Sequence, residues 1–179
     1  FWRKQNRYPK FKKKGKSRDS ATYYRNCFTL RDGKLKLAKQ SEPLGIRWSR
    51  PLPDGADPSQ VTVSRDAAGR WFVSLLVEET ITPYASTDAA VGLDAGITTL
   101  VTLSTGEKIT NPKHEKKDRA KLAKAQRNMA RKQKGSNNRA KARLKVAKVY
   151  ARIADRRRDH LHQVTTRIVR ENQTIVIED

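Results

Sequence analysis

The chain has 179 residues, and its 40 Lys and Arg against 18 Asp and Glu give it a formal net charge of +22 and a pI near 10.5. A charge of this sign and size attracts polyanions such as nucleic acids over a long range. No run of the sequence approaches the roughly 18 apolar residues that a membrane-spanning helix needs, which excludes an integral helical membrane protein.

Cys27 is the only cysteine of the sequence. A single cysteine excludes an intrachain disulfide framework and a zinc site built from several thiolates of this chain, and it fits a reducing compartment. The chain starts at Phe1 without a Met or an apolar signal-peptide core, and it ends directly after the apolar segment 174–177. We therefore expect a fragment of a longer protein.

Residues 3–18 form a basic arm with nine Lys or Arg and no acid. Four aromatic residues lie in or beside this arm: Phe1, Trp2, Tyr8 and Phe11. Aromatic rings among cations suit stacking on bases between phosphate contacts, so Lys10 and Lys12 are predicted nucleic-acid contacts. The alternative is a solvated or disordered arm, because blocks of like charge are often tails.

Two hairpins are predicted next. Segment 21–30 leads through an Asp-Gly turn into the alternating segment 35–37, and a second hairpin has its turn at 66–69 between segments 61–63 and 71–77. Short antiparallel strands without helices favour a small antiparallel barrel or sandwich through Thr80. Segment 81–89, with Pro, Ser and Thr, is predicted to be a linker.

The pattern changes after the linker. Three strands are predicted between residues 90 and 109, followed by helices at 113–134 and 139–170 with a break at 135–138, and by a last strand at 174–177. The last strand can rejoin the first three through a helical crossover, which predicts half of an α/β sheet domain. The second helix is expected to turn one apolar side toward the sheet, with these residues: Leu144, Ala147, Tyr150, Ala151, Ile153, Ala154, Leu161, Val164, Ile168 and Val169.

The helical hairpin carries most of the net charge, since 19 Lys or Arg lie between residues 113 and 158 against three acids. Cations on consecutive turns can follow a phosphate backbone, whereas so many like charges on a merely solvated surface would repel one another. The predicted nucleic-acid contacts of the hairpin are Arg127, Arg131, Lys132, Lys134 and Arg139.

Asp94 lies inside the apolar segment 90–97, and Glu178 directly follows the last apolar segment. Carboxylates rarely occupy such positions without a partner. If the two strands are neighbours, both carboxylates project to one edge of the sheet and can share a hard cation such as magnesium. The alternative is that Asp94 caps a turn beside Gly96 and that Glu178 is a merely exposed residue.

Several motifs resemble, in the same order, the TnpB family of transposon proteins, which are relatives of the type V CRISPR effectors. The motifs are GLDAGI at 92–97, NPK at 111–113, RKQKGSNNR at 131–139, KARLKVA at 141–147, DHLH at 159–162 and VIED at 176–179. Upstream, YPKFK at 8–12 and RDS at 18–20 are similar to the family's entry into its wedge-type β-barrel domain. The resemblance spans nearly the whole chain.

The resemblance implies an α+β chain with three parts. A basic arm and a wedge-like antiparallel β-barrel occupy 1–80, a linker occupies 81–89, and the first half of a RuvC-like nuclease domain of RNase H type occupies 90–179, with the basic helical hairpin inserted in it. It further implies that Asp94 and Glu178 are the first and second catalytic acids and ligate magnesium or manganese. Family members also carry a Cys-x-x-Cys zinc ribbon and a third catalytic Asp; neither is in this sequence, so the chain alone is expected to be inactive and to have no zinc site.

The function implied is that of an RNA-guided, magnesium-dependent DNA endonuclease of a mobile element, with a guide RNA and a DNA target as partners. Its implied location is the cytoplasm of a prokaryotic cell, in association with the nucleoid. Composition alone favours a non-catalytic nucleic-acid-binding module, and a transposase acting in DNA recombination is the third reading. His160 and His162 are two residues apart on a helix and point to different sides, so we do not expect them to bind a metal as a pair.

Overall fold

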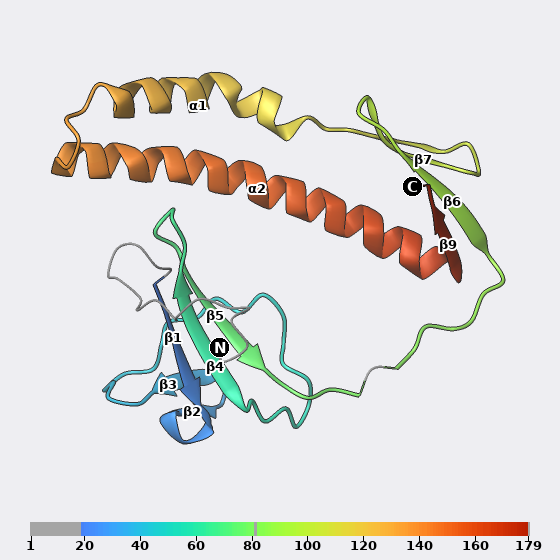
Figure 1. Ribbon diagram of the computed structural model, residues 1–179. Coiled ribbons are helices and arrows are strands. Elements are labelled where there is room, and N and C mark those ends of the chain that lie inside the picture. Colours follow the sequence, from blue (N-terminus) through green and yellow to red (C-terminus); the bar gives the residue numbers. More distant parts are fainter. Residues whose placement is uncertain (1–18, 81, 179) are drawn as a thin grey trace, which may run out of the picture. The chain divides into compact units, whose positions relative to one another are not determined.

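The structure is a computed structural model that describes residues 19–80 and 82–178 (Figure 1). The chain is divided between residues 80 and 81 into two compact units, and each is described by itself. The predicted basic arm, with the predicted contacts Lys10 and Lys12, lies outside the described residues.

The described part of the first unit, residues 19–80, contains five strands and one 3-10 turn. Their bounds are β1 Asp19–Tyr24, η1 Arg25–Cys27, β2 Phe28–Arg31, β3 Lys34–Leu37, β4 Gln60–Arg65 and β5 Trp71–Leu76. Strand β4 pairs antiparallel with β1 on one side and β5 on the other, while β2 and β3 form a separate antiparallel pair. The turns of both predicted hairpins, β2–β3 and β4–β5, are therefore confirmed. The predicted first arm at 21–30 is wrong as one strand, because η1 divides it and its first part, β1, pairs with β4.

The predicted barrel is wrong for the part of the chain that the structure describes, because neither of these sheets closes on itself. Residues 38–59, which would have to supply closing strands, contain no strand. They include four prolines, Pro43, Pro51, Pro53 and Pro58, and proline lacks the backbone donor that a sheet ladder needs. Leu35 of β3 and Val61 of β4 are both fully buried in one core, so the two sheets pack on each other as in a sandwich.

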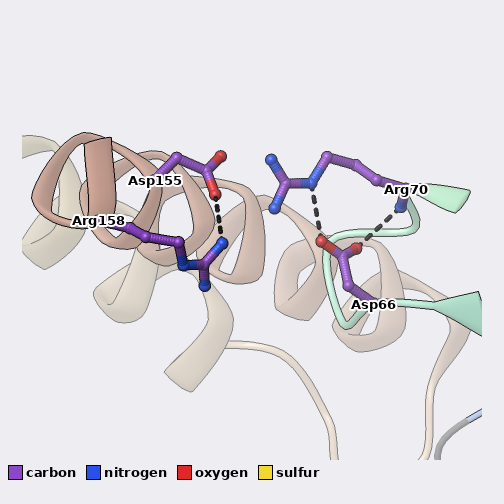
Figure 2. Close-up of polar contacts among 4 residues, drawn as sticks. All are labelled: Asp66, Arg70, Asp155 and Arg158. Carbon is purple, nitrogen blue, oxygen red and sulfur yellow. Dashed lines mark hydrogen bonds and ion pairs between the residues drawn. The ribbon is translucent and has the colours of Figure 1, made fainter. Parts of the chain in front are cut away.

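Local turn chemistry explains both hairpins. Asp32 and Gly33 have φ angles of 50° and 69°, and a two-residue hairpin loop with two positive φ angles favours Asp-Gly. At the β4–β5 turn, Asp66 accepts hydrogen bonds from the backbone N–H of Arg70 at 2.9 Å and from its Nε at 2.7 Å (Figure 2). This carboxylate holds both ends of the turn together.

The Asp66 carboxylate is expected to make the first unit sensitive to acid. Although partial desolvation raises its pKa, the hydrogen bonds from Arg70 outweigh that effect and lower the pKa of Asp66 below its ordinary value. A depressed folded-state pKa contributes stability above the unfolded-state pKa, and this contribution is lost as the pH falls through the folded-state value. Urea unfolding of Asp66→Asn should show a deficit of about 0.5–1 kcal/mol at neutral pH, and this deficit should shrink as the pH falls below the ordinary pKa of aspartate, about 3.9. A deficit that is independent of pH would contradict the role of the charge.

The second unit begins with a four-stranded sheet. Its strands are β6 Ala90–Ala95, β7 Thr99–Leu103, β8 Lys108–Thr110 and β9 Thr174–Ile177, in the order β8-β7-β6-β9. The first three pair antiparallel, whereas β9 pairs parallel with β6. The predicted return of the last strand to the same sheet is confirmed.

The crossover consists of two helices, α1 at His114–Ala130 and α2 at Asn137–Glu171, which lie side by side in Figure 1. A break between them is confirmed, with Gly135 at a φ of 84°, but it spans residues 131–136 where the prediction had 135–138. Ser136 caps α2, because its Oγ accepts a hydrogen bond from the backbone N–H of Arg139 at 3.2 Å. Among the described residues, neither helix combines the length and the apolar character needed to cross a membrane.

The packing of α2 differs from the prediction that one apolar side faces the sheet. Its N-terminal part packs on Leu122 of α1, and only its C-terminal end, with Ile168, packs on the sheet. The residues of α2 that bury against α1 are Val146, Val149 and Ile153. The prediction placed Tyr150, Leu161 and Val169 on the apolar side, but all three are exposed. The reason is that α2 uses one face to contact α1 and another face to contact the sheet.

Candidate functional site

Asp94 is the fifth residue of β6 and is exposed. Its neighbours Val91 and Leu93 turn to the opposite face, where they pack in the core that includes Ile168 of α2. Because successive side chains of a strand alternate between the two faces, Asp94 lies on the face of the sheet away from α2.

Glu178 directly follows β9 and is also exposed. In the parallel pairing, Leu93 is opposite Ile177, and the backbone N–H of Glu178 donates to the Leu93 carbonyl at 3.4 Å. One step further along this register sets Glu178 beside Asp94, on the same face. The predicted metal site required that the strands of Asp94 and Glu178 be neighbours. Strands β6 and β9 are neighbours in the sheet.

Gly96 allows the tight turn that follows Asp94. A Cβ at this position would lie 2.9 Å from the carbonyl oxygen of Thr99, closer than such atoms can approach. The Gly96 N–H also donates to the Leu100 carbonyl at 3.3 Å. The Thr99 carbonyl therefore approaches Gly96 so closely that a larger residue at position 96 would not fit.

The two carboxylates fit a magnesium or manganese ion better than a softer metal. Hard cations prefer oxygen ligands, and magnesium commonly takes one or two protein carboxylates and keeps several waters. Within residues 19–80 and 82–178, no group of three or more His, Cys, Asp or Glu gathers as a metal cage. Any ion at this edge would thus be held by Asp94, Glu178 and water within the described part of the chain.

Four of the five predicted contacts on the helical hairpin are exposed cations near the turn between α1 and α2. We call Arg127, Arg131, Lys132 and Lys134 the hairpin tip. The fifth, Arg139, is half-buried, and its Nη1 donates to the carbonyls of Met129 at 3.1 Å and Lys132 at 2.9 Å. The guanidinium of Arg139 satisfies carbonyls at the end of α1, so it holds the turn that presents the other four.

Asp118 and His114 are two further residues that sequence reasoning did not single out. Asp118 is 6% exposed and accepts hydrogen bonds from Arg152 and Arg156 of α2, the second at 3.0 Å. The ring of His114 contacts that of His160 edge-on, with the centroids 6.1 Å apart. The one available signal for Asp118 was an acid inside a basic helix. No local sequence feature connects His114 to His160, which lies 46 positions later.

Comparison with known proteins identifies the family. Residues 72–179 match the OrfB_IS605 family, which is described as "Probable transposase". The chain belongs to this family. The matched part of this OrfB_IS605 member includes β5 from Phe72 onward, the whole second unit, and both candidate acids.

Several relatives of this OrfB_IS605 member bear the name of a nuclease. A "Putative RNA-guided DNA endonuclease" of Streptomyces pristinaespiralis is 69% identical over 179 residues, and "Putative RNA-guided DNA endonuclease InsQ" of Escherichia coli is 36% identical over 180 residues. A relative from Mycobacterium tuberculosis with a similar name is 27% identical over 95% of this chain. The first two alignments cover all of this chain, which spans 44% of the length of either relative.

Proposed function

We propose that this OrfB_IS605 member forms part of a RuvC-like endonuclease, in which Asp94 and Glu178 ligate magnesium or manganese and the basic helix pair binds nucleic acid. The observation that supports the proposal is the parallel register of β6 and β9, in which Leu93 is opposite Ile177, the residues directly before Asp94 and Glu178. The strand order β8-β7-β6-β9, with a parallel return after a helical crossover, suits the RNase H type fold that the resemblance implies.

The reaction is hydrolysis of a phosphodiester bond. A divalent cation held by Asp94 and Glu178 would supply Lewis-acid stabilisation of the phosphate oxygens and would make a water molecule more acidic. Asp94 and Glu178 would contribute the negative charge that retains the cation, and Gly96 allows the tight turn that follows Asp94. The exposed face gives a polymeric substrate access to both carboxylates.

The partners are a DNA target and a guide RNA, as the names of the relatives indicate for those proteins. The net charge of +22 supports binding of polyanions, and the hairpin tip offers four exposed cations at one end of the second unit. Such contacts follow the phosphate backbone and do not read base sequence.

A second candidate is a nucleic-acid-binding module that acts without catalysis, including a role in transposition as the family description suggests. The large positive charge alone favours it. In this case the basic surfaces would matter and both carboxylates would be dispensable.

Magnesium binding separates the two candidates. Calorimetry at fixed salt should detect one magnesium or manganese site in the 179-residue chain, and Asp94→Asn and Glu178→Gln should each weaken it by at least about tenfold. The loss should be similar in both variants because the two carboxylates share one ion. Salt must be fixed because it changes the interaction of a highly charged protein with every ion.

Asp159→Asn is the matched control, since Asp159 is an exposed acid on α2 whose side chain accepts a hydrogen bond from Gln163 at 3.1 Å. This variant should bind the cation as the unmodified chain does. Binding that is indifferent to both Asp94→Asn and Glu178→Gln, or an equal loss in Asp159→Asn, would favour the module without catalysis.

A further inference from the structure

A cavity of about 520 Å³ lies where the sheet of the second unit meets the two helices. Its walls come from the segment before α1, from the first turns of α1, and from the middle of α2, with Leu100 of β7 also contributing. It lies within one unit of the chain, and Asp94 and Glu178 do not line it.

The wall of this cavity is strongly basic. Four cations line it, namely Lys113, Lys116, Arg119 and Arg157. One acid, Glu115, also lines it and lies 3.8 Å from Arg157 in an exposed ion pair. The cavity therefore holds an excess of positive charge even when both of its histidines are neutral.

Two residues that line the cavity, His114 and His160, each carry a buried ring nitrogen without a hydrogen-bond partner in the described part of the chain. Among the residues that the structure describes, nothing pairs with the Nε2 atoms of His114 and His160, although both atoms are buried. Buried polar atoms are rarely left unpaired, and each exception points to a missing partner. An imidazole N–H at Nε2 can donate to an oxyanion.

The backbone before α1 is shaped to form this wall. The Oδ1 of Asn111 accepts the backbone N–H of Lys113 at 3.1 Å, and Lys113 has a φ of 46°. This left-handed residue sets the direction of α1, whose N-terminus borders the cavity. The backbone N–H groups of a first helical turn add positive potential for an anion.

The charges decide between an anion and a metal ion as the ligand. Two imidazoles can bind a transition metal, yet the four cations around them would repel it, whereas they attract an anion. Burial lowers the pKa of His114 first, and His160, Lys117, Arg156 and Arg157 lower it further. A bound anion would oppose each of these charge effects.

We propose that this cavity binds a phosphate group of a nucleic-acid backbone, held by Arg119 and Arg157 and by the imidazole rings of His114 and His160. The proposal rests on the proposed function only in taking a nucleic acid as the source of the phosphate. The NPK motif at 111–113 then has a physical role, because it shapes the wall of a phosphate site at the base of the helix pair. The volume exceeds what a phosphate alone needs, which leaves space for an attached sugar.

Histidine NMR tests the cavity directly, because the chain has three histidines and His162 does not line the cavity. Sodium sulfate, added against sodium chloride at constant ionic strength, should shift the ring signals of His114 and His160 in a saturable manner and leave His162 unchanged. Dithymidine monophosphate, which has one phosphodiester, should cause the same shifts, whereas thymidine should not. Sulfate keeps its charge over the relevant pH range, so a change in the histidine signals reports binding and not titration of the anion.

Arg119→Gln and Arg157→Gln should each weaken the binding of both anions by about tenfold or more, since each removes a charge-assisted contact. Arg143→Gln, an equal change of charge at an exposed residue of α2 outside the cavity, should stay within about twofold. The signals of His162 report whether each variant is folded.

Equal shifts at His162, no shifts, or an equal loss in Arg143→Gln would overturn the cavity as a phosphate site. Shifts with sulfate but none with the dinucleotide would overturn the nucleic-acid backbone as its source. Anion binding should persist in Asp94→Asn, so a failure of the magnesium site and a failure of this cavity give different results.

Discussion

Replacing Asp118 by asparagine is expected to lower the free energy of unfolding of the second unit by about 2 kcal/mol. Asp118 lies in the basic helix α1 and is 6% exposed, and it bridges to both Arg152 and Arg156 of α2. Loss of the carboxylate charge leaves two guanidinium groups beside a neutral amide. The loss stays below that of a fully buried pair, because the side chains of Arg152 and Arg156 are 38% and 46% exposed and water can solvate them.

Urea unfolding followed by far-ultraviolet circular dichroism measures this change, since the helices dominate that signal. Arg158→Gln is the control, because Arg158 is 80% exposed and lies 3.9 Å from Asp155 at the surface of α2 (Figure 2). Its unfolding free energy should change by less than about 0.5 kcal/mol. Similar effects of both variants would mean that Asp118 contributes no more than a surface charge.

Replacing all four residues of the hairpin tip by glutamine is expected to weaken nucleic-acid binding about a hundredfold at moderate salt. Each lost phosphate contact also removes roughly 0.7–0.9 from the slope of log K against log salt, so the slope should become about 3 units less steep. Fluorescence anisotropy with a labelled oligonucleotide at several salt concentrations measures both quantities. Arg139 stays unchanged in this variant because its guanidinium holds the hairpin turn.

The control removes four exposed cations from the other unit, at Arg31, Lys34, Lys36 and Lys39 around the β2–β3 hairpin. It has the same change of net charge as the hairpin-tip variant. A smaller effect on affinity and slope is expected from the control. Equal effects would show that affinity depends on the overall field of the chain and would contradict a localised interface at the tip.

Local sequence signals predicted most elements of the second unit. The break between α1 and α2 is encoded by Gly135, which adopts a positive φ, and by Ser136, which caps the next helix. In the first unit, the Asp32-Gly33 turn likewise depends only on its own two residues. These features depend on backbone preferences within a few positions, so they could be read without knowledge of the fold.

The faces of α2 could not be read in the same way. An apolar residue on a helix packs on whichever partner reaches it, and α2 meets α1 along one part and the sheet at its end. The sequence alone does not reveal where along α2 the contact with α1 ends and the contact with the sheet begins. The same holds for the β-barrel, whose closure depends on whether a distant loop supplies a strand.

For the candidate site, the sequence supplied Asp94 and Glu178, and the resemblance supplied their roles. Asp94 and Glu178 are 84 positions apart in the sequence. Whether they lie next to each other depends on how β6 and β9 pair, and this pairing forms only when the whole unit folds.

The sequence by itself determined the charge, the turns, the element order and the family, because these depend on composition and on short-range preferences. Only the tertiary structure decided that Asp118 meets two arginines of α2, and that His114 and His160 line one basic cavity. The physical reason is that ion pairs and cavities form between side chains that folding brings together, and the energies that select these pairings belong to the packed state.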